Sequence, residues 1–320
     1  MIKVSVIIPV YKVEQYIEKC VRSLMEQTMK EGIEYLFIND CSPDDSMGVL
    51  KRTLDDYPER ISQARFFNLP ENHKTAYVRT LGLKEAHGEY VIFCDADDWV
   101  DVEMYEMMFQ TAKENDVDIV VCNHIRHSKE GQFPSKYHYR RNPSEVIRFL
   151  YEQDLFKFSP LWNKLIRGAI FREYNCFPYP GINQSEDLNM LVRVFCHARS
   201  LYHLEDKYYY HYNRLNVNSI CETPKDNHQL WLDRKRNAEL ITAFLMEQDP
   251  KLYRFTCNNL KFYTKNWFRK EMSSRDFFYT WRESHRDILH YKTSPLKARI
   301  IEWVFYRNFW LYQLLNKITA

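Results

Sequence analysis

The 320-residue sequence predicts an α/β protein with a doubly wound, mostly parallel sheet flanked by helices, and a C-terminal helical extension. Over the first 122 residues, apolar β-branched segments alternate with segments of helical spacing, and the connections are short, as in a parallel sheet. Acidic or turn-rich segments follow three of the strands, where such sheets hold their ligands. We expect a core domain over residues 1–222 and a helical, basic and aromatic region over residues 223–320.

The first half contains five short apolar segments, each typical of a buried strand. The first of them, Val4 to Tyr11, is rich in β-branched residues and has a proline near its end. Between the strands, apolar residues recur three or four positions apart, which predicts helices. The expected strands are residues 4–11, 34–38, 64–68, 90–94 and 118–122, and the expected helices are residues 13–26, 47–57, 74–86 and 103–114.

The second half has a less regular pattern. Residues 124–141 are polar and are expected to be irregular, and a helix is expected at residues 144–151. Residues 161–166 are expected to lead into a short helix, and an apolar helix is expected to open at residues 184–188. The aromatic segment 208–212 predicts a strand, and the spacing is helical from about residue 226 onward.

Three carboxylates follow the strand expected at residues 90–94, namely Asp95, Asp97 and Asp98. Oxygen ligands at such short spacing suit a hard divalent cation, which usually accompanies a phosphate. An acidic helix N-terminus is the alternative interpretation, because aspartate is common there. However, Tyr11 and Asp40 also follow strands, so three strand ends bring such groups to one edge of the sheet. This convergence favours a ligand site.

The composition limits the functions that need consideration. With seven glycines, the chain contains neither G-x-G-x-x-G nor G-x-x-x-x-G-K-[ST]. Its eight cysteines are scattered without a C-x-x-C pair, which predicts reduced thiols rather than a disulfide framework or a zinc site. The N-terminus lacks a signal-peptide pattern, and no uninterrupted apolar run is long enough to predict a membrane span. We therefore expect a cytoplasmic protein.

The last 70 residues are strongly basic. They contain 14 lysines and arginines against five aspartates and glutamates, a formal net charge of +9, whereas the whole chain carries +2. Residues 300–312 interleave aromatic and charged side chains, as in helices that lie on an anionic membrane surface. A helix that packs its aromatic residues on the core is the other interpretation. No nucleic-acid partner is expected, because no base-reading module is recognisable.

Six segments carry a recognisable pattern, and they are Ser5-Val6-Ile7-Ile8-Pro9-Val10-Tyr11, Asn39-Asp40-Cys41-Ser42, Asp95-Ala96-Asp97-Asp98-Trp99, Trp162-Asn163-Lys164-Leu165, Glu186-Asp187 and Asn218-Ser219-Ile220. In their order and rough spacing, these segments resemble those of family 2 glycosyltransferases. The resemblance covers about residues 3–220 and implies the GT-A fold. The chain departs from the family pattern before the central strand, where Thr80 replaces the usual asparagine after Arg79 and His73 stands where glycine is frequent.

This resemblance implies an inverting transfer of a sugar from a nucleotide-diphosphate donor, a UDP-sugar, to an acceptor hydroxyl. It implies a divalent cation, Mn²⁺ or Mg²⁺, on Asp97 with Asp95 beside it, and a hydrogen bond from the uracil base to Asp40. Arg79, with Lys74, is expected either to offset the phosphate charge or to be a solvated cation on a helix face. The expected donor-binding residues are Pro9, Val10, Tyr11 and Glu14 at the base pocket, together with Asp40, Lys74, Arg79, Asp95, Ala96 and Asp97.

The resemblance assigns the acceptor proton to the second acid of the Glu186-Asp187 pair, so Asp187 is the expected general base and Glu186 the second candidate. Ser185 followed by two acids is also the pattern of a helix N-terminus. His211 is expected either as a third metal ligand with Asp95 and Asp97 or as a structural residue.

These features together predict a metal-dependent glycosyltransferase that extends a polysaccharide or a lipid-linked acceptor, cytoplasmic or peripheral at the inner face of the plasma membrane. One alternative is a non-catalytic protein that binds nucleotide sugars or acts as a scaffold. Another is a nucleotidyltransferase, which would normally carry a glycine-rich, basic phosphate loop near the N-terminus. Residues 10–14 do not provide such a loop.

Overall fold

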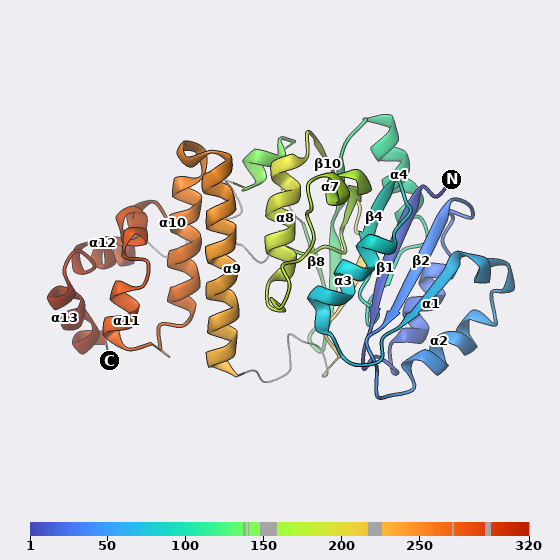
Figure 1. Ribbon diagram of the computed structural model, residues 1–320, viewed down its shortest axis with the longest axis horizontal. Coiled ribbons are helices and arrows are strands. Elements are labelled where there is room, and N and C mark those ends of the chain that lie inside the picture. The colour runs from blue at the N-terminus through green and yellow to red at the C-terminus, as the bar shows by residue number, and fades with distance from the viewer. Residues whose placement is uncertain are drawn as a thin grey trace. The chain divides into compact units, whose positions relative to one another are not determined.

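The computed structural model describes residues 1–136, 139, 141–147, 159–216, 226–270, 272–291 and 296–319. It separates into two compact units (Figure 1). The first unit comprises Met1–Pro143 and Ser159–Pro224, and the second comprises Ser144–Phe158 and Lys225–Ala320. The expected domain boundary at residues 222–223 and the segment Asn218-Ser219-Ile220 lie outside the described residues. Of the helix expected at residues 144–151, residues 144–147 are described and helical, and residues 148–151 lie outside the described residues.

A seven-stranded sheet in the order β10-β6-β9-β4-β1-β2-β3 forms the centre of the first unit (Figure 1). Strands β4, β1, β2 and β3 run parallel, β10 runs parallel to β6, and β9 is antiparallel to both of its neighbours. The expected mostly parallel α/β sheet is therefore confirmed. The strands are β1 Val4–Val10, β2 Ile33–Asn39, β3 Ala64–Asn68, β4 Tyr90–Phe93, β6 Ile119–Cys122, β9 Lys164–Arg167 and β10 Leu201–Leu204.

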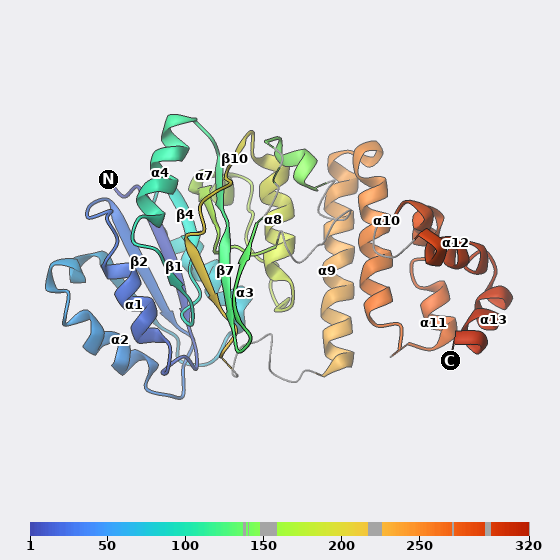
Figure 2. The same cartoon turned by 180° about the vertical axis from the view of Figure 1, so that it is seen from behind.

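Helices cover both faces of this sheet, as Figures 1 and 2 show. Val4, Val6 and Ile8 alternate along β1 and enter the buried core that includes residues of α1, α2 and α4, while Ile7 points to the opposite face, under α3. Helices α1 Ile17–Met25, α2 Ser46–Leu54 and α4 Met104–Glu114 lie on one face, and α3 Lys74–Glu85, α7 Gly168–Glu173 and α8 Glu186–His197 lie on the other; a 3₁₀ helix, η1 Pro58–Gln63, precedes β3.

A second, four-stranded sheet has the order β5-β11-β7-β8. The expectation that residues 124–141 are irregular is wrong for residues 124–135, which form the hairpin β7–β8. Strand β8 is exposed and β7 is half-buried after its first residue, so the hairpin carries no buried apolar alternation that would mark it in the sequence. Strand β9, which precedes the expected short helix α7, was likewise not predicted. The four strands are β5 Trp99–Val100, β7 His124–Ser128, β8 Gly131–Ser135 and β11 Tyr210–Asn213.

The described part of the second unit is helical. Asp249 caps α10 by accepting hydrogen bonds from the N–H groups of Lys251 and Leu252, both at 2.9 Å, and Pro250 occupies the first turn. No helix among the described residues is long and apolar enough to cross a membrane. The elements are α9 Asn227–Gln248, α10 Pro250–Trp267, α11 Ser274–Tyr279, η2 Arg282–His290, α12 Leu296–Phe305 and α13 Phe309–Thr319.

Gly82 allows α3 to lie close to the sheet. A Cβ atom at this position would stand 2.4 Å from Cγ2 of Ile7 and 3.0 Å from Cδ1 of Ile38. In an open helix, alanine would be favoured over glycine by about 1 kcal/mol, but overpacking a core costs about 1–3 kcal/mol. The clash with Ile7 makes the net effect of an added Cβ atom destabilising, because a buried β-branched side chain has little room to move.

We therefore expect Gly82→Ala to lower the free energy of unfolding by about 1–2 kcal/mol, as measured by urea denaturation. Lys84→Ala, on the exposed side of the same helix, should change it by less than about 0.5 kcal/mol. Equal or greater stability of Gly82→Ala would show that α3 can move away from the sheet without cost.

Candidate active site

The carboxyl ends of β1, β2 and β4 meet at one edge of the large sheet. The strands are parallel, and their register pairs Val10 with Asn39 and Ile7 with Phe93. Asp40 follows β2 directly, and Asp95 follows β4 after one residue. The segments that the sequence analysis singled out are thus brought together at this edge.

Asp40 is 4% exposed and connects β2 to the start of α3. One carboxylate oxygen accepts the N–H of His73 at 2.7 Å, and the other accepts the N–H of Lys74 and the side-chain amide of Asn72, both at 2.9 Å. Burial raises the pKa of Asp40, although these two backbone hydrogen bonds oppose the shift. Asp40 therefore holds the first turn of α3, the helix that carries Arg79.

The loop after β1 is fastened to the loop after β2. The N–H of Lys12 donates to Oγ of Ser42 at 2.8 Å, and Oε2 of Glu14 accepts the N–H of Asp45 at 3.1 Å. Val10 is buried, Pro9 is half-buried, and Tyr11 is exposed at the strand end. These positions are compatible with the expected base pocket, which remains a prediction.

The Asp95-Ala96-Asp97-Asp98 segment is held by residues at and beyond the end of β11. Asp98 is buried and accepts the hydroxyl of Tyr210 at 2.6 Å and the N–H of Asn213 at 2.7 Å. The side-chain amide of Asn216 donates to Oδ2 of Asp97 at 2.8 Å. Ala96, between Asp95 and Asp97 in the sequence, is buried. These contacts fix Asp97 next to Asp95.

Burial disfavours the ionised forms of the three carboxyl groups in this segment. It raises the pKa of Asp97 to about 6, with repulsion from Asp95 as the second cause. It also raises the pKa of Asp98 well above its ordinary value, and that of Asp95 despite the attraction of Arg79. Grouped, partly desolvated carboxylates favour a proton or a metal cation as a neighbour.

Arg79 lies among carboxylates. Its Nη1 is 2.6 Å from Oε1 of Glu186, its Nη2 is 3.7 Å from Oδ1 of Asp95, and its guanidinium lies over the Phe93 ring. Burial lowers the pKa of Arg79, but attraction to Glu186, Asp95 and Asp187 outweighs it, so the net pKa is raised. Arg79 thus joins the two acidic segments of the site. Its expected contact with donor phosphate remains a prediction, as does that of Lys74, whose side chain is exposed.

Glu186 and Asp187 begin α8, and their environments differ. Glu186 forms the ion pair with Arg79, and burial raises its pKa to about 7. Asp187 accepts the N–H of Leu188 at 2.7 Å and forms no ion pair within 4 Å with any described side chain. Burial raises the pKa of Asp187, while Arg79 and Lys164 attract its charged form. Asp187 is therefore the less engaged acid of the pair.

Lys164 is a further charged group of this region. It is fully buried, its ammonium donates to Oδ1 of Asn163 at 2.8 Å, and burial lowers its pKa to about 7 although Asp187 attracts its charged form. The segment around Lys164 carried part of the family resemblance, but the sequence alone suggested no role for its ammonium.

His211 has partners of its own. Its Nε2 is 2.8 Å from Oδ1 of Asp101, its Nδ1 is 2.9 Å from Nε2 of His127, and its ring stacks on Trp99. These contacts fit the structural interpretation of His211, and they engage both nitrogens that a metal would need. Its role as a ligand remains a prediction.

Metal binding can be judged from the donor atoms. Within the described residues, no group of three or more histidine, cysteine, aspartate or glutamate side chains is arranged to hold a metal ion. Asp95 and Asp97 nevertheless fit a Mg²⁺- or Mn²⁺-type site, because such ions are often bound through one or two carboxylates and complete their shell with water and substrate phosphate. The carboxylate pair thus suits a metal that arrives with its nucleotide.

Four non-glycine residues in the loops around the site have left-handed backbone conformations. Lys12, Cys41, Lys74 and Ser185 have φ values between 55° and 66°. Such conformations cost about 1–3 kcal/mol each and persist where the surrounding structure enforces them, often at functional sites. The loops that carry the candidate residues are therefore held in defined shapes.

The supporting residues Tyr210, Asn213 and Asn216 were not predicted. Tyr210 lay within an aromatic segment that was expected only to form a strand, and its ring stacks on Trp162 with centroids 4.2 Å apart. Asn213 and Asn216 gave no local signal, because their partners lie more than 100 positions earlier in the chain.

Comparisons with known proteins agree with this geometry. The family model described as glycosyl transferase family 2 matches residues 5–174. The putative glycosyltransferase EpsH of Bacillus subtilis is 31% identical over 253 residues, which cover 77% of this chain and 70% of that protein. The uncharacterized glycosyltransferase EpsJ of the same organism is 29% identical over 228 residues, which cover 69% of this chain and 63% of that protein.

Solved structures give the same fold. The crystal structure of Staphylococcus aureus TarS 1–349 in complex with UDP aligns with a TM-score of 0.72 at 17% identity, over 97% of this chain and 89% of that one. In sequence, TarS, a poly(ribitol-phosphate) β-N-acetylglucosaminyltransferase, is 24% identical over 274 residues that cover 84% of this chain but only 46% of TarS. The fold is therefore that of an α/β nucleotide-sugar transferase, the GT-A fold. The chain belongs to glycosyltransferase family 2.

The raised pKa of Asp97 predicts a specific pH dependence of stability. Between the ordinary pKa near 3.8 and the folded-state pKa of about 6, the folded protein binds more protons at Asp97 than the unfolded chain does. Without metal, the stability contributed by this group therefore falls as the pH rises from about 4 to 6.

Asp97→Asn should remove that fall. In metal-free buffer, the unfolding midpoint of Asp97→Asn minus that of the parent should therefore increase from pH 4.5 to pH 7. With UDP present at pH 7, Mn²⁺ should raise the midpoint of the parent but not of Asp97→Asn. Asp55→Asn, at an exposed position after α2, is the control and should follow the parent. Parallel curves for Asp97→Asn and the parent would contradict the assignment.

Proposed function

We propose that the chain is an inverting glycosyltransferase that moves a sugar from a UDP-sugar to a hydroxyl of a growing saccharide or lipid-linked acceptor in cell-surface polysaccharide synthesis. The observation that carries this proposal is the grouping of Asp95, Glu186 and Asp187 around Arg79 at the carboxyl edge of the sheet, with Asp97 close enough to Asp95 for the two carboxylates to repel. The UDP and UDP-GlcNAc complexes of TarS support the choice of donor.

A divalent cation fits the first step of such a reaction, which requires neutralisation of the diphosphate leaving group. Asp97, assisted by Asp95, would hold Mn²⁺ or Mg²⁺, and the cation would supply Lewis-acid stabilisation of the leaving phosphates. A mannosyltransferase of the same fold, with a TM-score of 0.52 and 13% identity, has been solved with GDP-mannose and Mn²⁺.

Asp187 is the proposed general base. Its raised pKa makes it a better proton acceptor than an ordinary aspartate, while Glu186 is engaged with Arg79. Direct attack by a hydroxyl deprotonated in this way, without a covalent intermediate, inverts the anomeric carbon. Activity should fall as the pH drops through the raised pKa, because the protonated carboxyl cannot accept a proton.

The alternative of a non-catalytic scaffold is less well supported. A binding protein has no need for an acid with few partners beside a second, ion-paired acid, and both are present at the start of α8. The chain also lacks the basic, glycine-rich loop of a nucleotidyltransferase.

We expect Asp187→Asn to lower kcat for sugar transfer by about 10²–10⁴-fold and to leave UDP binding nearly unchanged, because general base catalysis contributes about that factor. Release of UDP from a panel of UDP-sugars, with acceptor present, measures the first quantity, and calorimetry with UDP measures the second. Glu173→Gln, at an exposed position at the end of α7, is the control. Full transfer by Asp187→Asn would overturn the assignment.

We also propose that α12 and α13 contact an anionic membrane. Leu296, Ile300 and Val304 recur every four residues along one side of α12 and are exposed, and Trp310 of α13 is 68% exposed. The unit around them is basic, which favours anionic lipid. The aromatic Tyr306 is buried instead. We therefore propose that the exposed aliphatic side chains of α12 contact the membrane, while Tyr306 packs inside the unit.

The double substitution Ile300→Glu with Val304→Glu should reduce binding to phosphatidylglycerol vesicles by at least about tenfold, because two apolar side chains lose their transfer into lipid. Sedimentation with vesicles measures this. Ile61→Glu, at a similarly exposed position in η1, should retain binding. Equal binding by all three proteins would exclude this surface.

A further inference from the structure

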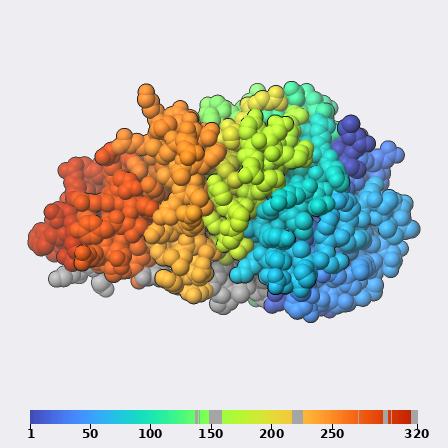
Figure 3. All heavy atoms as spheres, viewed as in Figure 1, coloured from blue at the N-terminus to red at the C-terminus, as the bar shows by residue number. Residues whose placement is uncertain are grey.

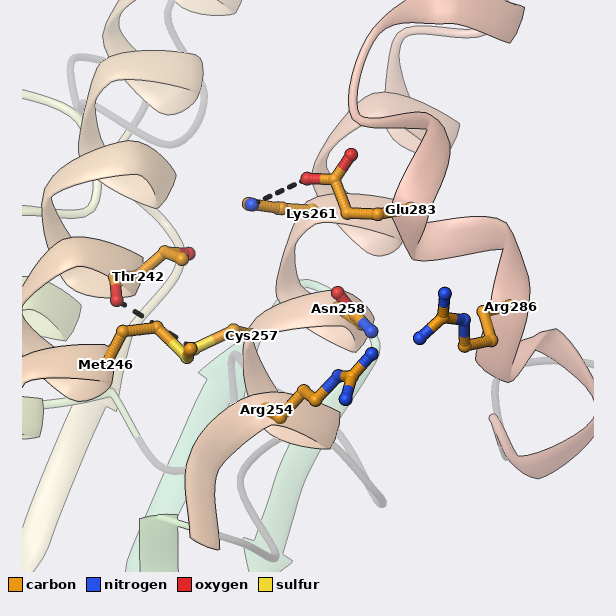
Figure 4. A pocket seen from close by; sticks show the side chains of 8 residues that line it. All are labelled: Thr242, Met246, Arg254, Cys257, Asn258, Lys261, Glu283 and Arg286. Carbon is orange, nitrogen blue, oxygen red and sulfur yellow. Dashed lines mark hydrogen bonds and ion pairs between the residues drawn. The ribbon is translucent and has the colours of Figure 1, made fainter. Parts of the chain in front are cut away.

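The second unit contains a pocket of about 210 Å³ that belongs to neither the sheet nor the candidate active site. It lies among α9, α10 and η2 (Figure 4). Buried Cys257 and the apolar Met246 form one side, with the Cys257 thiol 4.0 Å from the carbonyl oxygen of Thr242. The lining residues are Thr242, Met246, Arg254, Cys257, Asn258, Lys261, Glu283 and Arg286.

The charges of this pocket are not balanced. Lys261 forms an ion pair with Glu283 at 2.7 Å, and each neutralises the other. Arg254 and Arg286 form no ion pair within 4 Å with any residue that the structure describes. The pocket therefore retains two positive charges from these two guanidinium groups.

Both guanidinium groups are directed to the same space. Figure 4 shows the end groups of Arg254, from α10, and Arg286, from η2, extending toward one another next to the side chain of Asn258. The Asn258 amide donates to Oδ2 of Asp287 at 2.7 Å, which fixes the amide beside the two arginines and leaves the negative charge of Asp287 next to the pocket. Two like charges held near one another repel, and an anion between them would remove the repulsion.

We propose that Arg254 and Arg286 bind a phosphate monoester group in this pocket. A guanidinium presents a planar fork of N–H donors that matches phosphate oxygens, and two forks can bind one phosphate from two sides. A monoester has three acceptor oxygens and nearly two negative charges at neutral pH, so it can accept from both guanidinium groups at once, whereas a carboxylate has two oxygens and one charge. The ester is carried either by a soluble molecule or by a lipid headgroup.

Binding can be measured on the full chain by calorimetry at pH 7.5 with inorganic phosphate and with glycerol 3-phosphate, and with acetate as the carboxylate control. Arg254→Gln and Arg286→Gln should each raise the Kd at least about tenfold, since each removes a charge-assisted hydrogen bond and about 1.4 kcal/mol corresponds to tenfold. Both side chains are exposed, so the unfolding midpoint should not change. Arg275→Gln, at an exposed position of α11, is the charge-matched control.

Two further comparisons separate the outcomes. If phosphate bound at the donor site, the double variant Arg254→Gln with Arg286→Gln would still bind it. Loss of phosphate binding in this double variant, together with unchanged phosphate binding in Asp97→Asn, therefore supports the pocket. Sedimentation with phosphatidic acid vesicles, in the same variants, distinguishes a lipid source from a soluble one. The proposal is overturned if the double variant binds every probe as tightly as the parent does, or if acetate binds as tightly as phosphate. It is also overturned if Arg275→Gln weakens phosphate binding as much as the double variant does.

Discussion

The candidate site depends on the grouping of several desolvated carboxylates in two segments, with the partly buried Arg79 between the segments. Burial raises the pKa of each acid, and Arg79 supplies the ion pair that keeps the two acidic segments together. Arg79 alone cannot balance them, because Asp97 keeps a pKa of about 6 in spite of the amide of Asn216. The site is therefore prepared for additional positive charge, which a metal with its nucleotide would bring. The carboxylates concerned are Asp95, Asp97, Asp98, Glu186 and Asp187.

The central part of this arrangement could be predicted from the sequence because it follows from topology. Parallel strands place their carboxyl ends at one edge, so a polar group that follows an apolar run can be assigned to that edge without knowledge of its neighbours. Asp40 after β2 and Asp95 after β4 are such cases. The position of the acids at the start of α8 followed from the family resemblance and from the helical spacing of the residues after them.

Other features depend on contacts that no local pattern records. Asn216 binds Asp97 from 119 positions further along the chain, and His211 is engaged by His127 and Asp101 through the second sheet. The hairpin β7–β8 was missed because β8 is exposed and β7 is uniformly half-buried after its first residue, so neither strand shows an alternation of buried and exposed positions. Strand β9 was missed because it is only four residues long and has just two apolar residues, between a lysine and an arginine, which is too short a pattern to separate a strand from a helix start.

The hydrogen bonds of Asp40 have a consequence for how a donor would enter. The carboxylate that the resemblance offers to the base already accepts two backbone N–H groups from the first turn of α3 and one side-chain amide. A base that donates to Asp40 must share these oxygens or displace a donor. Helix α3 also carries Arg79. A base that displaced one of the donors on Asp40 would therefore also affect the position of Arg79 between the two acidic segments. Recognition of the nucleotide and alignment of the reacting groups would then be a single conformational equilibrium.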